Sequence, residues 1–277
     1  MDPYNERFGG LARLYSASGL ERLRCAHVCV VGVGGVGSWA VEALARSGVG
    51  ALTLVDLDDV CVRNVNRQIH ALDGELGKPK VEVLARRIQA INPACRVDAR
   101  QAFFVKSNAE ELLAPGYSAV LDAIDSPSLK AFLIGSCRER GLPVVTTGAA
   151  GGRRDPTAIK VADLSESSND RLLFQVRRLL RRHHAFPQPG ERFGVECVLS
   201  REPVVYPGDD GSVCAARPGD PDLRLDCETG YGTACFVTGA FGLVAASRIV
   251  AAITGEGRSG PGVGRWETNG AKSEPGR

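Results

Sequence analysis

Two cationic side chains that could stabilise developing negative charge stand close together in the stretch RNVNRQIHALDGELGKPK, residues 63–80. Arg67 offers a planar set of hydrogen-bond donors, and Lys80 offers a compact positive charge. An enzyme that breaks the α–β bond of ATP needs such charge at the α-phosphate and at the departing pyrophosphate, whereas a dehydrogenase that holds NAD does not. The pair therefore favours transfer of AMP over transfer of hydride. Other polar side chains of this stretch are expected to contact the same nucleotide: Asn64, Asn66 and Gln68.

Carboxylates follow two of the apolar segments that we interpret as strands. In DAIDS, Asp125 is placed to bind a Mg²⁺ that bridges phosphates, and Asp122 is expected to support it. Asp56 ends the segment ALTLVD and can accept hydrogen bonds from ribose hydroxyls, and we include Asp58 in the same nucleotide site. Because NAD and ATP both contain that ribose, Asp56 indicates an adenosine ligand without choosing between them.

A glycine-rich turn, GVGGVGSW, stands between the first apolar segment and a helical segment. Gly32, Gly35 and Gly37 permit a tight turn and a close approach of backbone amides to phosphate, and Gly34 lies in the same turn. The motif alone is weak, but the order strand, turn, helix, strand makes nucleotide binding the favoured interpretation over a purely structural turn.

The segments that must position these residues alternate between strand and helix patterns. This alternation predicts an α/β fold: a doubly wound, Rossmann-like, mostly parallel sheet, with a loop-rich, partly antiparallel C-terminal half. We expect one or two helices in 5–24, helices over 38–47, 80–91, 128–140 and 171–184, and strands over 26–31, 51–56, 96–103, 118–124, 142–148 and 159–163. Residues 5–253 would form one domain, with a nucleotide-binding half to about 150, a substrate half over 151–253, and a disordered tail at 254–277.

Composition excludes several classes of protein. The chain has 277 residues, of which 44% are hydrophobic, and a net charge of only +2, so a nucleic-acid partner would need a local basic patch. The nine cysteines include no C-x-x-C pair, which argues against a four-cysteine zinc site. The apolar segment 236–253 is interrupted by Arg248 and predicts a buried helix rather than a membrane anchor. We therefore expect a cytoplasmic location.

A local basic patch does occur in RLLFQVRRLLRRHH, residues 171–184. Its arginines recur at helical spacing and could contact RNA phosphates, although a solvated basic face explains such a run equally well. The four residues concerned are Arg177, Arg178, Arg181 and Arg182.

Taken together, GVGGVGSW, LVDLDDV, RNVNRQIHA, GKPKVEV, INP and DAIDS resemble the ThiF/MoeB superfamily of adenylating enzymes, which are related to ubiquitin activators. RFGGLARLY, VTTGAAGG and the VYP…GSVCA…DC segment are more similar to one branch, the tRNA threonylcarbamoyladenosine dehydratases. The resemblance implies binding of ATP by the positions that match Gly35, Asp56, Asn64, Arg67, Lys80 and Asp125. It also implies a homodimer in which an N-terminal arginine reaches into the neighbour's site. Arg13 matches that position best, and Arg7 is the second choice.

The branch further implies the substrate and the chemistry. Its substrate is the modified adenosine beside the tRNA anticodon, whose carboxylate is converted by ATP into an acyl-adenylate before the side chain closes into a ring. A cysteine-desulfurase or sulfur-acceptor partner and a monovalent cation are left open by the resemblance. Cys227 could serve as a nucleophile, but a non-essential loop cysteine is at least as plausible because cyclisation needs no covalent enzyme intermediate.

Three other functions stay open on the sequence. The chain could adenylate the C-terminus of a sulfur-carrier or ubiquitin-like protein, although the missing C-x-x-C pairs weaken that reading. It could be an NAD-dependent oxidoreductase, or a non-enzymatic, nucleotide-gated tRNA-binding or scaffold protein.

Overall fold

A seven-stranded sheet forms the centre of the computed structural model, which describes residues 2–255 except 115, 209 and 216–230. The strand order is β3-β2-β1-β4-β5-β7-β6. All neighbouring strands pair in parallel except β6 and β7, which are antiparallel. The strands are β1 His27–Val31, β2 Ala51–Val55, β3 Arg96–Arg100, β4 Ala119–Asp122, β5 Val144–Thr147, β6 Ile159–Asp163 and β7 Glu196–Ser200. A separate two-stranded pair consists of β8 Tyr206–Pro207 and β9 Val213–Cys214.

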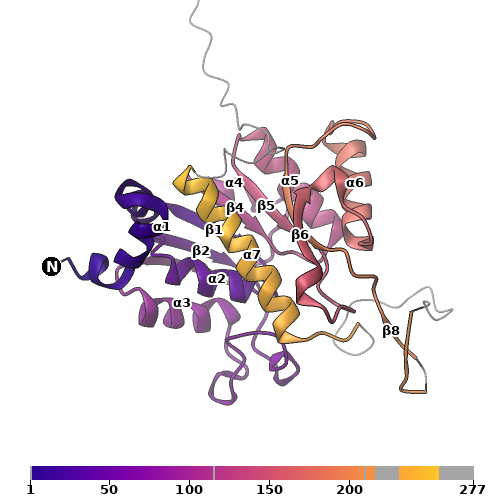
Figure 1. The fold of residues 1–277 in the computed structure, drawn as a ribbon, viewed down its shortest axis with the longest axis horizontal. Coiled ribbons are helices and arrows are strands. Elements are labelled where there is room, and N and C mark those ends of the chain that lie inside the picture. Colours follow the sequence, from indigo (N-terminus) through magenta and orange to yellow (C-terminus); the bar gives the residue numbers. More distant parts are fainter. Residues whose placement is uncertain (1, 115, 209, 216–230, 256–277) are drawn as a thin grey trace, which may run out of the picture.

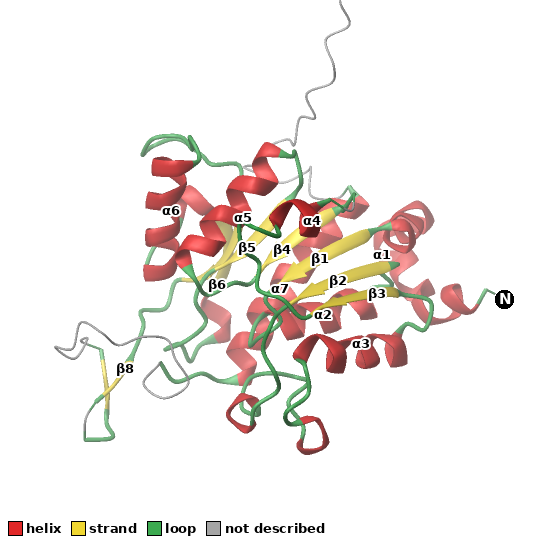
Figure 2. Cartoon of the chain, turned by 180° about the vertical axis from the view of Figure 1, so that it is seen from behind, coloured by secondary structure: helices red, strands yellow, loops and turns green. Residues whose placement is uncertain are grey.

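Helices cover both faces of the sheet. The helices α1, α2, α3 and α7 lie on the face toward the viewer in Figure 1, and α4, α5 and α6 cover the opposite face, which is in front in Figure 2. The bounds are α1 Pro3–Cys25, α2 Gly37–Arg46, α3 Lys80–Ile91, α4 Ala109–Leu113, α5 Pro127–Glu139, α6 Arg171–His183 and α7 Cys235–Thr254. Four short 3₁₀ turns are η1 Val62–Asn64, η2 Asp73–Glu75, η3 Pro156–Ala158 and η4 Leu164–Glu166.

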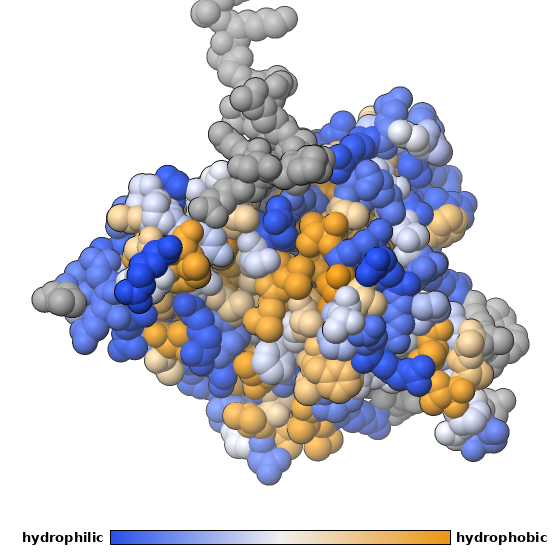
Figure 3. All heavy atoms as spheres, viewed as in Figure 1, coloured by the Kyte–Doolittle hydropathy of each residue, from blue (hydrophilic) through white to orange (hydrophobic). Residues whose placement is uncertain are grey.

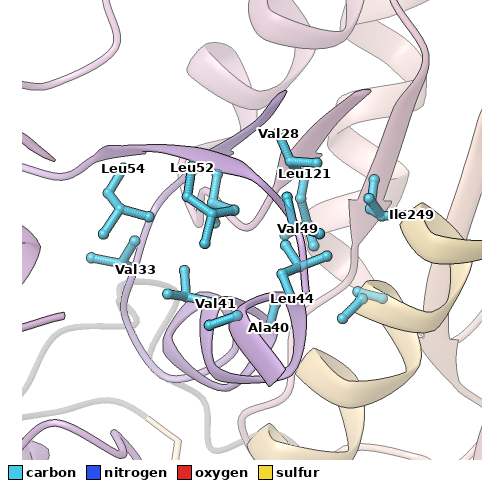
Figure 4. Close-up of a cluster of buried hydrophobic side chains, with 14 of the residues drawn as sticks. Val28, Val33, Ala40, Val41, Leu44, Val49, Leu52, Leu54, Leu121 and Ile249 are labelled. Carbon is cyan, nitrogen blue, oxygen red and sulfur yellow. The ribbon is translucent and has the colours of Figure 1, made fainter. Parts of the chain in front are cut away.

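Alternation along the strands explains why the sheet is buried on both faces. Val28 and Val30 of β1 belong to the core beneath α2 and α7, whereas Cys29 and Val31 belong to the core beneath α5 and α6. Successive side chains of a strand point to opposite faces, so a strand covered on both sides reads as a continuous apolar run. Figure 4 shows the first of these cores, where apolar side chains of the sheet meet those of α2 and α7.

The predicted fold class is confirmed: a mostly parallel, Rossmann-like α/β sheet with an antiparallel strand in its C-terminal half. The strand predicted over 96–103 is wrong at its end, because β3 stops at Arg100 and the following residues leave the sheet to line a pocket. The N-terminal segment is one helix with a kink at Ser16, whose φ is 66°. The sheet continues from β5 into β7 and β6, so it crosses the boundary that we placed near residue 150.

The apolar helix α7 is a core helix. By length and composition it is the one helix of the described residues that could cross a membrane. Its inward side chains Val237, Phe241, Ala245 and Ile249 are fully buried against α2 and the sheet. This packing confirms the buried helix expected over 236–253.

Candidate active site

A pocket of about 1000 Å³ lies over the carboxyl ends of the central strands. The chain proceeds from β1 outward to β3 and then returns to β4 on the other side of β1, so the strand order reverses beside β1. Ligands of doubly wound sheets bind at such a reversal. We call the lining from 32–36, 56–68 and Lys80 the nucleotide wall, and the lining from 147–151 the far wall. Leu172, Thr238 and residues 231–233 also line the pocket, as do residues 102–104, 123–125 and Leu129.

The glycine turn is required by close backbone contacts. Gly32 has a φ of +86°, and a Cβ there would lie 2.8 Å from the carbonyl oxygen of Ala123. A Cβ at Gly37 would lie 1.9 Å from the carbonyl oxygen of Gly32. No side chain fits at either position. The turn therefore brings backbone amides and the start of α2 to the pocket, which suits a phosphate group.

Asp56 fastens this turn to the end of β2. Its two carboxylate oxygens accept hydrogen bonds from the backbone N–H groups of Val33 at 2.8 Å and Asp58 at 2.9 Å. Burial raises the pKa of the Asp56 carboxyl, and the positive charge of Lys80 opposes that rise. Asp56 lines the pocket, so the same side chain holds the turn and faces the space that a ribose would fill.

Lys80 begins α3 and is buried, with its Nζ 2.7 Å from Oδ2 of Asp58. Its backbone N–H also donates to the carbonyl oxygen of Asp58 at 3.0 Å. Asp58 is the exposed member of the pair. The ammonium group is therefore held at the pocket lining by Asp58.

Arg67 is held through its backbone. Its carbonyl oxygen accepts hydrogen bonds from Trp39 Nε1 at 3.0 Å and Thr238 Oγ1 at 3.1 Å. Its guanidinium donates to the carbonyl oxygen of Arg63 at 2.6 Å and to Oδ1 of Asn66 at 3.1 Å. The helices α2 and α7 thus fix the position of Arg67 from two sides, and its side chain lines the pocket.

The other polar residues of this segment have different surroundings. The Asn64 side chain accepts from the backbone N–H of Cys61 at 3.0 Å and so closes the turn η1. Within the described chain, Gln68 Oε1 and both ring nitrogens of His70 are buried without a hydrogen-bond partner. Burial, together with the charges of Lys80 and Arg87, lowers the pKa of His70 to about 4. His70 is therefore neutral beneath the nucleotide wall at neutral pH.

The two aspartates of DAIDS lie in different places. Asp125 is exposed and lines the pocket. Asp122 is fully buried behind it, paired with Lys130 Nζ at 2.8 Å and accepting from Thr146 Oγ1 at 2.6 Å. Its other carboxylate oxygen accepts from the backbone N–H of Ile124 at 3.1 Å. Asp122 thus holds the loop that carries Asp125.

No group of three or more potential metal ligands occurs among the residues that the structure describes. Mg²⁺ in phosphate-transfer sites commonly takes one or two carboxylates and completes its shell with phosphate oxygens and water. The exposed carboxylate of Asp125 in the pocket lining fits that mode.

The far wall is fixed by a buried ion pair that our sequence reasoning missed. Arg153 is fully buried, with Nη2 3.6 Å from Oδ2 of Asp170. Its guanidinium also donates to the carbonyl oxygens of Ala149 at 2.9 Å, Asn169 at 2.9 Å and Glu202. Burial lowers the pKa of Arg153, and the charges of Asp170 and Glu202 oppose this. The arginine therefore ties three backbone segments together behind the pocket.

Asp170 serves two structures at once. Oδ1 accepts from the backbone N–H of Leu173 at 3.0 Å, which caps the first turn of α6. Oδ2 accepts from the backbone N–H of Ala149 at 2.9 Å, in the far wall. A Cβ at Gly148 would lie 2.3 Å from the same Oδ2. The start of α6 therefore lies directly against the far wall, and the run of small residues GAAGG, 148–152, was the sequence signal for this close approach.

The arginines predicted to contact RNA divide into two groups. Arg177 donates to the carbonyl oxygen of Ser167 at 2.7 Å, and Arg181 donates through Nε to that of Pro187 at 3.0 Å. Arg178 and Arg182 are exposed. Arg13 and Arg7 are exposed on α1 and do not line the pocket of their own chain. Cys227 lies outside the described residues, as does the tail from residue 256.

The fold and the pocket define a Rossmann-like nucleotide-binding protein. A family model described as "ThiF family" matches residues 8–274, so the chain belongs to the ThiF family. The chain is 50% identical over 248 residues to the tRNA threonylcarbamoyladenosine dehydratase of Escherichia coli, covering 89% of this chain and 92% of that protein. The expectation of an enzyme is confirmed at the level of these relatives.

Solved structures agree with this assignment. A structure described as "TcdA (CsdL)" superposes with a TM-score of 0.85 at 46% identity, covering 93% of this chain and 97% of the other. The E. coli tRNA N6-threonylcarbamoyladenosine dehydratase in complex with ATP superposes with a TM-score of 0.82 at 45% identity, covering 94% and 99%. ATP is therefore a ligand of a protein with the same fold.

Proposed function

We propose that this chain uses ATP to dehydrate threonylcarbamoyladenosine in tRNA to its cyclic form. The observation that carries the proposal is that one pocket is lined by the glycine turn, by Lys80 and by a far wall that can hold a second reactant. The dehydratases that are similar over most of the chain support the choice of substrate.

The reaction would proceed in two steps. An oxygen of the substrate carboxylate attacks the α-phosphorus of ATP, and the bond to pyrophosphate breaks. A nucleophilic atom of the same side chain then attacks the acyl carbon, and AMP leaves with the former carboxylate oxygen, which accounts for the loss of one water. Because the second step is intramolecular, it needs positioning more than a strong base, and the far wall is placed to supply it.

The nucleotide wall would bind and polarise ATP. The turn at Gly32–Gly37 would hold phosphate oxygens, and Asp56 would accept from the ribose. Lys80 and Arg67 would stabilise the charge that develops on pyrophosphate, with Asn64, Asn66 and Gln68 shaping the same wall. Asp125 would bind a Mg²⁺, which neutralises phosphate charge when present.

We further propose that two copies of the chain complete the site. Figure 3 shows apolar side chains gathered over the face on which α7 lies, and Leu14, Phe236 and Leu243 are exposed on α1 and α7. An apolar surface of this kind suits a symmetric dimer, in which Arg13 of one copy would enter the pocket of the other. A cytoplasmic location, a catalytic Cys227, a monovalent cation and a sulfur-transfer partner stay predictions of lower rank.

The first test is mass spectrometry of nucleosides from a tRNA that bears threonylcarbamoyladenosine, after incubation with the protein, Mg²⁺ and ATP, with AMP measured in the same tube. We expect loss of one water from the modified nucleoside and one AMP for each product. Lys80→Ala should lower kcat/KM by about 100-fold or more, since one preorganised charge is removed. Lys78→Ala is the matched control, because Lys78 is exposed and its ammonium group contacts Glu75 and the carbonyl oxygen of Gly74 outside the pocket lining.

Unchanged nucleoside, from a wild-type protein shown to bind ATP, would contradict the proposal. A carrier protein ending in Gly-Gly would then be the next substrate. Mixing Arg13→Ala with Lys80→Ala tests the dimer, because a mixed dimer would contain one complete site of two. Recovery to about a quarter of wild-type activity is expected for free exchange of subunits, and no recovery would contradict a shared site.

A further inference from the structure

The exposed face of α6 carries a line of residues that combines positive charge with an aromatic ring. Arg171, Phe174, Arg178 and Arg182 follow one another at spacings of three, four and four, and all four are exposed. Residues at these spacings share one face of a helix. The opposite face, with Leu173, Val176 and Leu180, is buried in the core. We call the four exposed residues the α6 stripe.

The α6 stripe is free of neutralising partners. Residues 171–184 contain no acidic side chain, and no ion pair to Arg171, Arg178 or Arg182 is formed within the described part of the chain. Arg177 and Arg181 are excluded from it, because both donate to backbone carbonyl oxygens of the fold. The stripe therefore offers three cations to solvent, over a length of about 16 Å at 1.5 Å per residue.

Phe174 is the unusual member of the α6 stripe. Phe174 is 51% exposed, although burying an aromatic ring is favourable. The guanidinium of Arg178 lies 5.9 Å from the centre of this ring, and that of Arg177 lies 5.8 Å from it. An exposed ring between cations is the arrangement by which proteins stack unpaired bases while holding the adjacent phosphates.

The position of the stripe connects it to the pocket. Leu172, two residues before Phe174, lines the pocket, and Asp170 holds both the first turn of α6 and Ala149 of the far wall. A nucleotide whose side chain enters the pocket must leave its base stack, so its neighbour in the RNA is left with an uncovered face. Phe174 lies two residues after Leu172, on the exposed face of the same helix.

We propose that Phe174 stacks on a base next to the nucleotide under modification, while Arg171, Arg178 and Arg182 contact the phosphates of the same single-stranded loop. The occupant is thus an unpaired RNA segment, and the α6 stripe determines how the substrate is presented. The inference rests on the proposed function, because it places the reacting nucleotide in the pocket.

The experiment compares Phe174→Leu with Phe174→Tyr. Leucine keeps an apolar side chain without a π face, and tyrosine keeps the face. KM for the modified tRNA, kcat, and binding of an anticodon stem–loop RNA bearing the modified nucleoside would be measured at two salt concentrations. Phe174→Leu should weaken binding and raise KM about tenfold with kcat nearly unchanged, and Phe174→Tyr should restore both. Arg178→Gln should weaken binding and reduce its salt dependence.

Val161→Ala, at an exposed position of β6, is the control and should leave all three quantities unchanged. Equal KM and binding for wild type and Phe174→Leu, in a wild-type protein that turns over the modified tRNA, would overturn the inference and leave the proposed function standing. Absence of turnover by the wild type would overturn the proposed function instead. The binding titrations need no turnover, so in that case equal RNA affinity of the two proteins would still overturn the stacking role.

Discussion

The nucleotide wall and the far wall of one pocket are built in different ways. The nucleotide wall is held by backbone geometry: a glycine turn without room for side chains, and an aspartate that accepts from two backbone N–H groups. The far wall is held from behind by the side chains of Arg153 and Asp170, both fully buried, which join the loop after β5 to the start of α6 and to the residues after β7. One wall thus depends on the absence of side chains, and the other depends on two charged ones.

The largest loss of folding stability is expected from a substitution behind the far wall. Arg153→Met leaves the Asp170 carboxylate buried without its cation and removes hydrogen bonds to three backbone segments. Breaking a buried pair from one side costs about 3–5 kcal/mol, which denaturant unfolding would measure. Arg154→Met, at the exposed neighbouring position, is the control and should be near neutral. A loss in Arg153→Met as small as in Arg154→Met would show that the ion pair does not hold this wall.

At the nucleotide wall the corresponding change is the addition of one methyl group. In Gly37→Ala the Cβ would meet the Gly32 carbonyl oxygen at 1.9 Å, so the turn must open. We expect a loss of about 1–3 kcal/mol in stability and at least a tenfold weaker affinity for ATP by calorimetry. Gly34→Ala is the matched control, since its nearest neighbour would be 3.9 Å away. Similar ATP affinity in the two variants would show that the lack of space at Gly37 does not determine how ATP binds.

Beneath the nucleotide wall, the buried His70 should make the stability of the fold depend on pH. Its folded-state pKa of about 4 lies below the usual value near 6.5, so the unfolded chain takes up the proton first. The stability associated with the neutral ring is complete above about pH 6.5 and is lost as pH falls toward 4. In His70→Leu, the acid-induced loss of stability between about pH 7.5 and 4.5 should shrink by about 2 kcal/mol. Val161→Ala, at an exposed position without a titratable side chain, should keep the wild-type profile. An unchanged profile in His70→Leu would contradict a neutral, buried His70.

The smallest effect is expected where the nucleotide wall meets α7. Thr238→Val removes one of the two hydrogen bonds to the Arg67 carbonyl oxygen and leaves that from Trp39. A single bond of this kind contributes about 1 kcal/mol, so affinity for ATP should fall about fivefold. Thr233→Val, whose hydroxyl lies 3.4 Å from Asn66 Nδ2, should change that affinity less.

The difference between the nucleotide wall and the far wall also explains which parts of the site could be predicted from the sequence. The turn, Asp56 and Lys80 occupy ends of consecutive elements, so their meeting follows from a parallel sheet once strands and helices are recognised. The pairing of Arg153 with Asp170 depends on how α6 lies against the loop after β5, which no local pattern encodes. Asp122 was recognised as a supporting carboxylate, but its partner Lys130 was not, because both side chains are buried only in the folded chain. The end of β3 was misplaced because AFF, residues 102–104, has an apolar strand pattern but turns toward the pocket.

The double role of Asp170 also separates what can be redesigned in α6 from what cannot. The helix is held in place by Asp170, by its inward leucines and valine, and by the bonds of Arg177 and Arg181 to backbone carbonyl oxygens, whereas the residues of the α6 stripe are exposed. The outward positions could therefore be exchanged as a set, which under the proposed RNA contact would change the RNA loop that is bound, without rebuilding the pocket. The exposed face of α6 can thus change while Asp170 keeps the start of the helix in place.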